Sequence, residues 1–95
     1  MNPLYLIAEI HPDPSKIEEA KAAYLALIAE TLKEPGCLLY DLVAEDHSSS
    51  WIMLEKWESR DAWNAHMQTA HVKHINQSSA AFSSKETTLR FLTTA

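Results

Sequence analysis

Two histidines, one glutamate and two aromatic residues in the middle of this chain could together do acid–base chemistry on a bound ring. His66 and His71 carry imidazole groups, which exchange protons near neutral pH and therefore suit a general base. Glu55 adds a carboxylate to a stretch that is otherwise largely aromatic and apolar. Tyr40 and Trp57 have flat aromatic rings that could form the walls of a binding site for a planar molecule. We therefore predict an enclosed aromatic site.

Each of these residues also has a structural interpretation. His66 and His71 could pack or cap where a helix ends. Glu55 is costly to bury unpaired, so it either faces a cavity, where it orients a histidine or binds a hydroxyl group, or pairs with a cation such as Arg90. The two aromatic residues could instead be core or dimer contacts, as aromatic residues at strand spacing more often are. The sequence leaves these interpretations open.

The other reactive side chains predict no further site. His11, His47 and His74 fall in loop or surface positions, and the spacing of the five histidines indicates no metal centre. Cys37 is the only cysteine, which excludes an internal disulfide and suits a reducing cytosolic setting; we expect a buried, neutral thiol. Gly36 is the only glycine, so there is no glycine-rich phosphate loop.

Composition and charge narrow the class of protein. A chain of 95 residues has room for one domain, spanning residues 1–95. The net charge of −5, with no run of Lys or Arg, argues against a nucleic-acid partner. The apolar run at residues 4–10 is too short to span a bilayer, and the start of the sequence has no positively charged region, so we expect no targeting signal. We expect a cytoplasmic protein without a membrane partner.

Strand and helix patterns alternate along the chain and must position the candidate residues. Alternating apolar residues predict strands over residues 4–10, 37–45, 51–58 and 87–92, with a hairpin loop at residues 46–50. In the third of these strands, the period of two places on one face Trp51, Met53, Glu55 and Trp57.

Capping residues and apolar spacing predict the helices. A stripe at spacings of three and four indicates a helix over residues 17–31, begun by a capping box of Ser15 and Glu18 and stopped by Pro35-Gly36. Ser59 can cap a short helix that ends near residue 67. Thr69 can cap another, whose weaker apolar stripe consists of Val72, Ile75 and Phe82.

The order strand, helix, strand, strand, helix, strand is that of the ferredoxin-like α+β fold, a four-stranded antiparallel sheet with its helices on one side. The other side of the sheet is left bare. A domain this small buries a limited fraction of its surface, so we expect two copies to pack these bare faces together as a homodimer. We further expect the resulting barrel-like space to hold the site.

The sequence resembles the antibiotic biosynthesis monooxygenase family, and within it the bacterial quinol monooxygenases, over nearly its whole length. The residues that carry the likeness are Leu32-Lys33-Glu34-Pro35-Gly36-Cys37 followed by Tyr40, Glu55-Lys56-Trp57-Glu58-Ser59, and Ala65-His66-Met67-Gln68-Thr69-Ala70-His71 followed by Lys73. The resemblance implies a dimeric α+β barrel and includes oxygenases that act on anthrones and quinols without a cofactor. It also includes haem-degrading and isomerase-like members.

Two departures from these relatives can be seen in the sequence. Where the haem-degrading members have Asn, Trp and His, this chain has Ile10, His66 and Asn76, so haem degradation by that route is not expected. Ala70 stands where a proline is usual before His71.

Three functions fit these observations. The first is a monooxygenase that oxidises a small aromatic or quinol-type substrate with molecular oxygen and no metal or flavin. His66 or His71 would then be the base, Glu55 would orient it, and Trp57 and Tyr40 would flank the substrate. The second is an isomerase of a small carbonyl compound, which needs no oxygen. The third is a non-catalytic binding or stress-response module whose pocket sequesters a metabolite.

Overall fold

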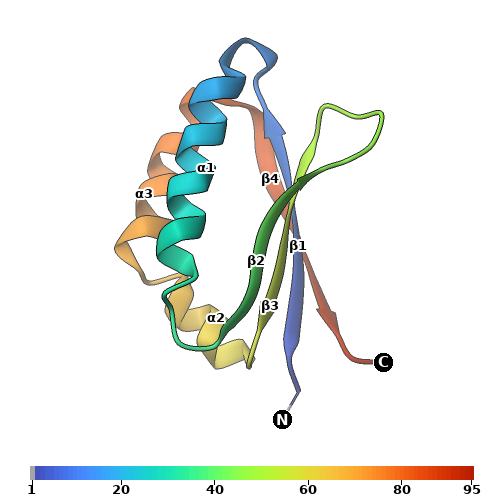
Figure 1. Ribbon diagram of the computed structural model, residues 1–95, viewed down its shortest axis with the longest axis vertical. Helices are drawn as coiled ribbons and strands as arrows, with labels where there is room; N and C mark the ends of the chain where they lie inside the picture. Colours follow the sequence, from blue (N-terminus) through green and yellow to red (C-terminus); the bar gives the residue numbers. More distant parts are fainter. Residues whose placement is uncertain (1) are drawn as a thin grey trace.

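The computed structural model describes residues 2–95 and shows a single sheet covered on one side by helices (Figure 1). The strands are β1 (Leu4–Pro12), β2 (Cys37–Ala44), β3 (Trp51–Trp57) and β4 (Ser83–Thr93). The helices are α1 (Ile17–Thr31), α2 (Arg60–His66) and α3 (Ala70–Ser78), with the short 3₁₀ helices η1 (Pro14–Lys16) and η2 (Ser79–Ala81).

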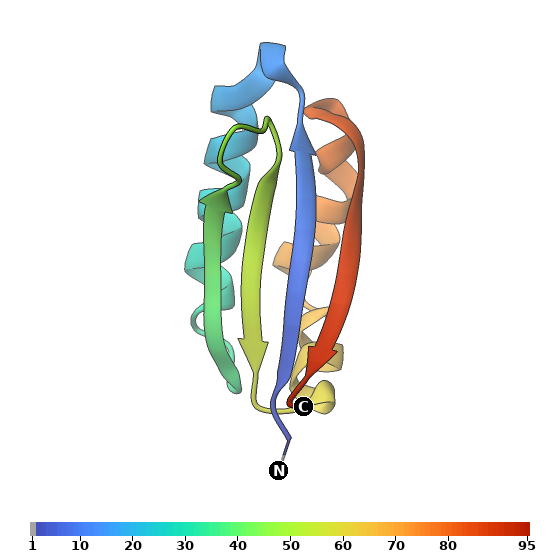
Figure 2. The ribbon, with the colours of Figure 1, turned by 90° about the vertical axis from the view of Figure 1, so that its right-hand side faces the viewer.

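The sheet has the order β2-β3-β1-β4, and each pair of neighbours is antiparallel. This arrangement confirms the predicted ferredoxin-like α+β fold. Figure 2 shows the sheet from its uncovered side, with β2 and β4 at the two edges and the helices behind. Within residues 2–95, no helix has both the length and the apolar character that crossing a membrane requires.

Regular apolar spacing explains why these segments pack together. In β1, every second residue turns toward the helices and is buried, namely Leu4, Leu6, Ala8 and Ile10. In α1, the residues buried against the sheet recur at spacings of four, three and four, namely Ala20, Tyr24, Leu27 and Thr31. These two rows form the centre of the core.

A tight turn after α1 fixes the loop that leads into β2. Gly36 has a φ of +84°, a left-handed conformation that glycine adopts without strain. A Cβ atom at this position would lie 2.7 Å from the Cβ of Ala62, and the backbone N–H of Glu58 donates to the Gly36 carbonyl at 2.8 Å. The turn therefore fastens the residues before it, including Glu34, against β3 and α2.

The structure differs from the predictions chiefly in one helix cap and in the start of the last strand. The predicted capping box is wrong, because Asp13 caps η1 and accepts hydrogen bonds from the backbone and hydroxyl of Ser15. The helix itself covers the predicted residues, Ile17–Thr31. The last strand begins at Ser83 rather than residue 87. Pairing with β1 extends it through a polar stretch that has no apolar alternation of its own.

The predicted location of the site, between the bare faces of two copies, is also wrong. Glu55 is paired directly across the sheet with buried Leu6 on one side and Tyr40 on the other, so these side chains share the helix-covered face. Strand alternation establishes which residues share a face, but it does not tell which face the helices cover. The candidate residues lie inside one protomer.

Candidate active site

A cavity of about 260 Å³ lies between the sheet and the helices. Its walls are mostly apolar, with side chains that include Ala8, Ile10, Leu27, Met53, Val72 and Ile75. The polar side chains Tyr40, Glu55 and His66 line it from buried positions, whereas Asn76, Thr87 and Leu89 line it from exposed positions on α3 and β4. The cavity thus opens between α3 and β4 and has a polar inner end.

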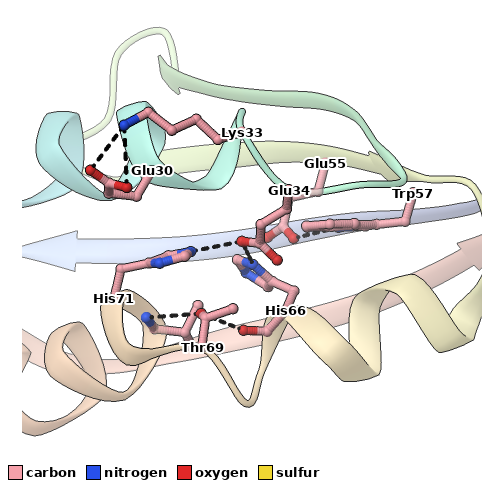
Figure 3. A network of polar contacts seen from close by, with 9 residues as sticks. Glu30, Lys33, Glu34, Glu55, Trp57, His66, Thr69 and His71 are labelled. Carbon is pink, nitrogen blue, oxygen red and sulfur yellow. Dashed lines mark hydrogen bonds and ion pairs between the residues drawn. The ribbon is translucent and has the colours of Figure 1, made fainter.

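Three side chains from distant parts of the chain meet beside this inner end (Figure 3). One carboxylate oxygen of Glu34, Oε2, lies 2.7 Å from Nδ1 of His66 and 2.7 Å from Nε2 of His71. Glu34 comes from the loop after α1, His66 from the end of α2 and His71 from the first turn of α3. The Thr69 hydroxyl caps α3 and donates to the His66 carbonyl at 2.7 Å, which fixes the turn between the two histidines.

His66 is held in a dry, aromatic environment. Its ring centre lies 4.6 Å from that of Trp57 and 5.4 Å from that of Tyr40, and the side chain is 3% exposed. Burial lowers the pKa of His66, while the hydrogen bond to Glu34 opposes this change in part. The lowered pKa favours a neutral imidazole at neutral pH.

The contact with Glu34 also determines which nitrogen of His66 is free. A carboxylate oxygen only accepts, so we assign the proton of the neutral ring to Nδ1, which donates to Glu34. Nε2 is then unprotonated. Because His66 lines the cavity, this nitrogen is available as a base to a bound molecule. Glu34 therefore has the orienting role that the sequence suggested for Glu55.

Glu55 faces the cavity and is hydrogen-bonded to the neighbouring indole. The Trp57 Nε1–H donates to Oε1 of Glu55 at 3.0 Å. Burial, with a smaller effect from the charge of Glu34, raises the pKa of Glu55 to about 7, although the indole bond acts in the opposite direction. Of the two alternatives for Glu55, the structure favours the cavity over an ion pair with Arg90, because Arg90 stands opposite Ile7 in the sheet and lies on the uncovered face. Glu55 can exchange a proton near neutral pH.

The two aromatic candidates lie in different positions relative to the cavity. Tyr40 lines it, and burial raises the pKa of its hydroxyl far above the usual range, so the group stays a hydrogen-bond donor. Trp57 is fully buried and does not line the cavity; its ring supports His66 and its N–H holds Glu55. The two rings do not face each other as the walls of one slot, since they meet edge-on at 6.3 Å.

His71 lies on the far side of Glu34 from the cavity. It lines a smaller depression of about 180 Å³ between α1 and α3, together with Glu30 and His74. Its side chain is 22% exposed, so it connects the Glu34 carboxylate to solvent. Cys37 is half-buried rather than buried as expected, and this partial burial raises the pKa of its thiol to about 11, which favours the neutral form.

Sequence reasoning missed Glu34 as a site residue. It stands directly before Pro35-Gly36, inside a stretch that carried the family resemblance, and this position was the available signal. With His66 and His71 it also forms the group of donor atoms, all within 4.8 Å of one another, that could hold a metal ion. The sequence separations of 32 and 37 residues hid this grouping.

Comparisons with known proteins agree with this fold. A family model described as "Antibiotic biosynthesis monooxygenase" matches residues 3–78. "Putative monooxygenase YcnE" of Bacillus subtilis is 33% identical over 69 residues, which cover 72% of this chain and 73% of that protein. A crystal structure from Pseudomonas aeruginosa has a TM-score of 0.90 and 30% identity, covering 100% of this chain and 96% of that one.

A longer human protein shares part of the same sequence. "N-terminal EF-hand calcium-binding protein 1" of Homo sapiens is 28% identical over 66 residues, or 70% of this chain. The matched region is 19% of the human protein, so this chain corresponds to about a fifth of that relative's length.

Proposed function

The chain belongs to the antibiotic biosynthesis monooxygenase family, and we propose that it oxygenates a small hydroquinone-type aromatic substrate with molecular oxygen, using His66 as the base. The observation that carries this proposal is the Glu34–His66 hydrogen bond at the inner end of the cavity. It provides an oriented, neutral imidazole in a place from which bulk water is largely excluded. A carboxylate that fixes the tautomer of a catalytic histidine is a recurring arrangement in enzymes.

The first step is a proton transfer. A phenolic hydroxyl placed beside Nε2 of His66 gives up its proton, and Glu34 stabilises the imidazolium that forms. The substrate becomes an electron-rich anion in a cavity whose walls are mostly apolar. Tyr40, which remains protonated, can donate a hydrogen bond to that anion.

The second stage transfers electrons to oxygen. The anion gives one electron to O₂, the resulting superoxide and substrate radical combine to form a C–O bond, and the peroxide takes a proton. Cleavage of the O–O bond, with loss of the ring hydrogen and release of water, leaves a new carbonyl group. One oxygen atom enters the product and the other enters water. Glu55, with a pKa of about 7, can deliver a proton to the departing oxygen.

Cavity size limits the substrate. An apolar cavity of roughly 150 Å³ is known to accept benzene. The present cavity, at about 260 Å³, is therefore suited to one ring or two fused rings. Dihydroxynaphthalenes meet both the size and the chemical requirements. The proposed reaction requires no bound metal or flavin, because the substrate anion itself reduces oxygen.

We propose a homodimer formed through the bare face of the sheet. This face exposes Leu39 and Leu92, and it carries further half-buried apolar residues, namely Tyr5, Ile7, Val43, Ile52 and Leu54. The charged residues Glu9, Asp41, Lys56 and Arg90 also lie on this face. Its apolar part is typical of an interaction surface. Sedimentation equilibrium should give twice the monomer mass. A cytoplasmic location is part of the same proposal.

A second candidate is isomerisation of a small carbonyl compound. The observation that favours it is the presence of two proton-exchanging groups, His66 and Glu55, on one cavity. One could remove a proton from carbon while the other returns one to oxygen. Such a reaction continues without oxygen, so turnover under anaerobic conditions would separate it from oxygenation.

Oxygen uptake with a panel of dihydroxynaphthalenes and anthrones tests the proposed function. We expect consumption of one O₂ per substrate, with one atom of ¹⁸O in the product, and a fall of about 100-fold or more in kcat for His66→Gln. His47→Gln, an exposed loop histidine, is the matched control and should keep the full rate. An unchanged rate in His66→Gln would reject His66 as the base.

A further inference from the structure

We infer that Glu34, His66 and His71 form a binding site for one divalent transition-metal ion of the zinc or cobalt class. The three residues offer two imidazole nitrogens and one carboxylate oxygen, all within 4.8 Å of one another. This donor set suits such ions, whereas magnesium and calcium favour oxygen ligands alone. The ion would lie behind His66, between it and His71, rather than in the cavity.

Small side-chain movements are enough to surround an ion. Bonds of about 2.0–2.2 Å place the ligands of one tetrahedral zinc ion roughly 3.3–3.5 Å apart. Oε2 of Glu34, now 2.7 Å from each nitrogen, must withdraw slightly, and the three donor atoms, which already lie within 4.8 Å of one another, need only small shifts to reach these spacings. His66 is fixed by the rings of Trp57 and Tyr40, so the other two ligands would do the moving.

The site is closed on one side and open on the other. The side chain of His66 is 3% exposed, whereas those of Glu34 and His71 are 12% and 22% exposed. An ion can therefore enter from the surface between α1 and α3, and a water molecule can complete its coordination from the same side. Thr69 already fixes the turn between the two histidines through its bond to the His66 carbonyl.

The ion would replace the two ring protons through which His66 and His71 donate hydrogen bonds to Glu34. Nδ1 of His66 and Nε2 of His71 must each offer a lone pair to the ion, so the proton of each neutral ring moves to its other nitrogen. In His66 that other nitrogen is Nε2, the one available to the cavity. Ion binding therefore converts His66 from an acceptor into a donor toward the cavity.

This change has a consequence that rests on the proposed function. A His66 ring that carries its proton on Nε2 cannot take one from the substrate. The ion would thus suppress the oxygenation, and a chelator would restore it. In the ion-free protein Glu34 would orient His66 as a base. In the loaded protein Glu34 and His66 would both be ligands of the ion.

Titration of the chelator-treated intact chain with zinc tests the site without any substrate. Calorimetry should show one ion per chain, and Glu34→Gln and His71→Ala should each weaken binding by about tenfold or more. His47→Ala is the matched control, because His47 is exposed, lies in the loop between β2 and β3 and is outside the donor group. Cobalt should give the visible absorption of a four- or five-coordinate ion at one equivalent.

A second measurement reads the tautomer of His66 directly. Nitrogen-15 spectra of the imidazole should show the proton on Nδ1 without zinc and on Nε2 with it. Absence of zinc binding at millimolar concentration would overturn the inference, as would equal affinity in Glu34→Gln and His47→Ala, or a tautomer that zinc leaves unchanged. Neither measurement involves oxygen or a quinol. If the oxygenation were not observed, the inferred metal site would still stand. If zinc did not bind, the proposed oxygenation would still stand.

Discussion

Replacing Glu55 with glutamine should stabilise the protein at neutral and alkaline pH. The side chain of Glu55 is buried, its residue is 6% exposed, and its hydrogen bond comes from the Trp57 indole. Burial is the main cause of a pKa raised from 4.5 to about 7. Glutamine has nearly the same shape and keeps an oxygen that can accept from the indole, but it carries no charge to bury.

The magnitude follows from the two pKa values. The folded chain holds the Glu55 proton more tightly than the unfolded chain does, so its contribution to stability is complete below about pH 4.5 and is lost as the pH rises through about 7. A change from 4.5 to about 7 corresponds to roughly 3 kcal/mol in the free energy of unfolding. Most of this loss should fall between about pH 5 and pH 8.

Urea unfolding of both proteins across this pH range gives the assay. Other titrating groups affect the two chains alike, so the difference between their free energies of unfolding isolates Glu55. We expect Glu55→Gln to gain about 2–3 kcal/mol relative to the wild type as the pH rises. Two curves that stay parallel from acid to alkaline pH would show that Glu55 does not hold its proton in the fold, and the reasoning would be refuted.

Three further substitutions probe how the site is held. Gly36→Ala should lower the free energy of unfolding by about 2 kcal/mol or more, measured in urea, because φ is positive there and a Cβ would meet α2 at 2.7 Å; a neutral result would contradict the tight turn. Thr69→Ala should cost about 1 kcal/mol through the lost cap of α3 and the lost bond to His66, and thermal unfolding that matches the wild type would count against it. Trp57→Phe removes the indole donor and should raise the pKa of Glu55 further, which carbon-13 titration of the carboxyl would reveal; a fall would be inconsistent with the hydrogen bond.

Local patterns in the sequence were sufficient to predict most of the fold. The alternation in β1 and β3 and the stripe on α1 each reflect one buried face, and a period can be recognised without knowing what covers that face. The caps Ser59 and Thr69 act within a few residues of themselves, and both predictions are confirmed. β4 was harder, because its first residues take their structure from pairing with β1 rather than from their own pattern.

The arrangement of the site depended on contacts that sequence spacing does not encode. His66 and His71 were recognised from their chemistry and their place at a helix break. Glu34 joins them across more than thirty residues because the turn at Gly36 returns the chain to α2. Which face of the sheet is covered is also a non-local property, because it depends on the side on which the helices that connect the strands pack. Neither fact leaves a local signature.

The spectrum of a dihydroxynaphthalene bound without oxygen tests the central claim most directly, because the ionised ring absorbs at longer wavelength than the neutral one. With the chelator-treated wild type under argon, we predict that the bound ligand is ionised at a pH where the free ligand is neutral, and that it is consumed when air is admitted. His66→Gln, with folding verified by circular dichroism, should bind the ligand in its neutral form. Equal ionisation in both proteins would contradict the assignment of His66 as the base in this cavity.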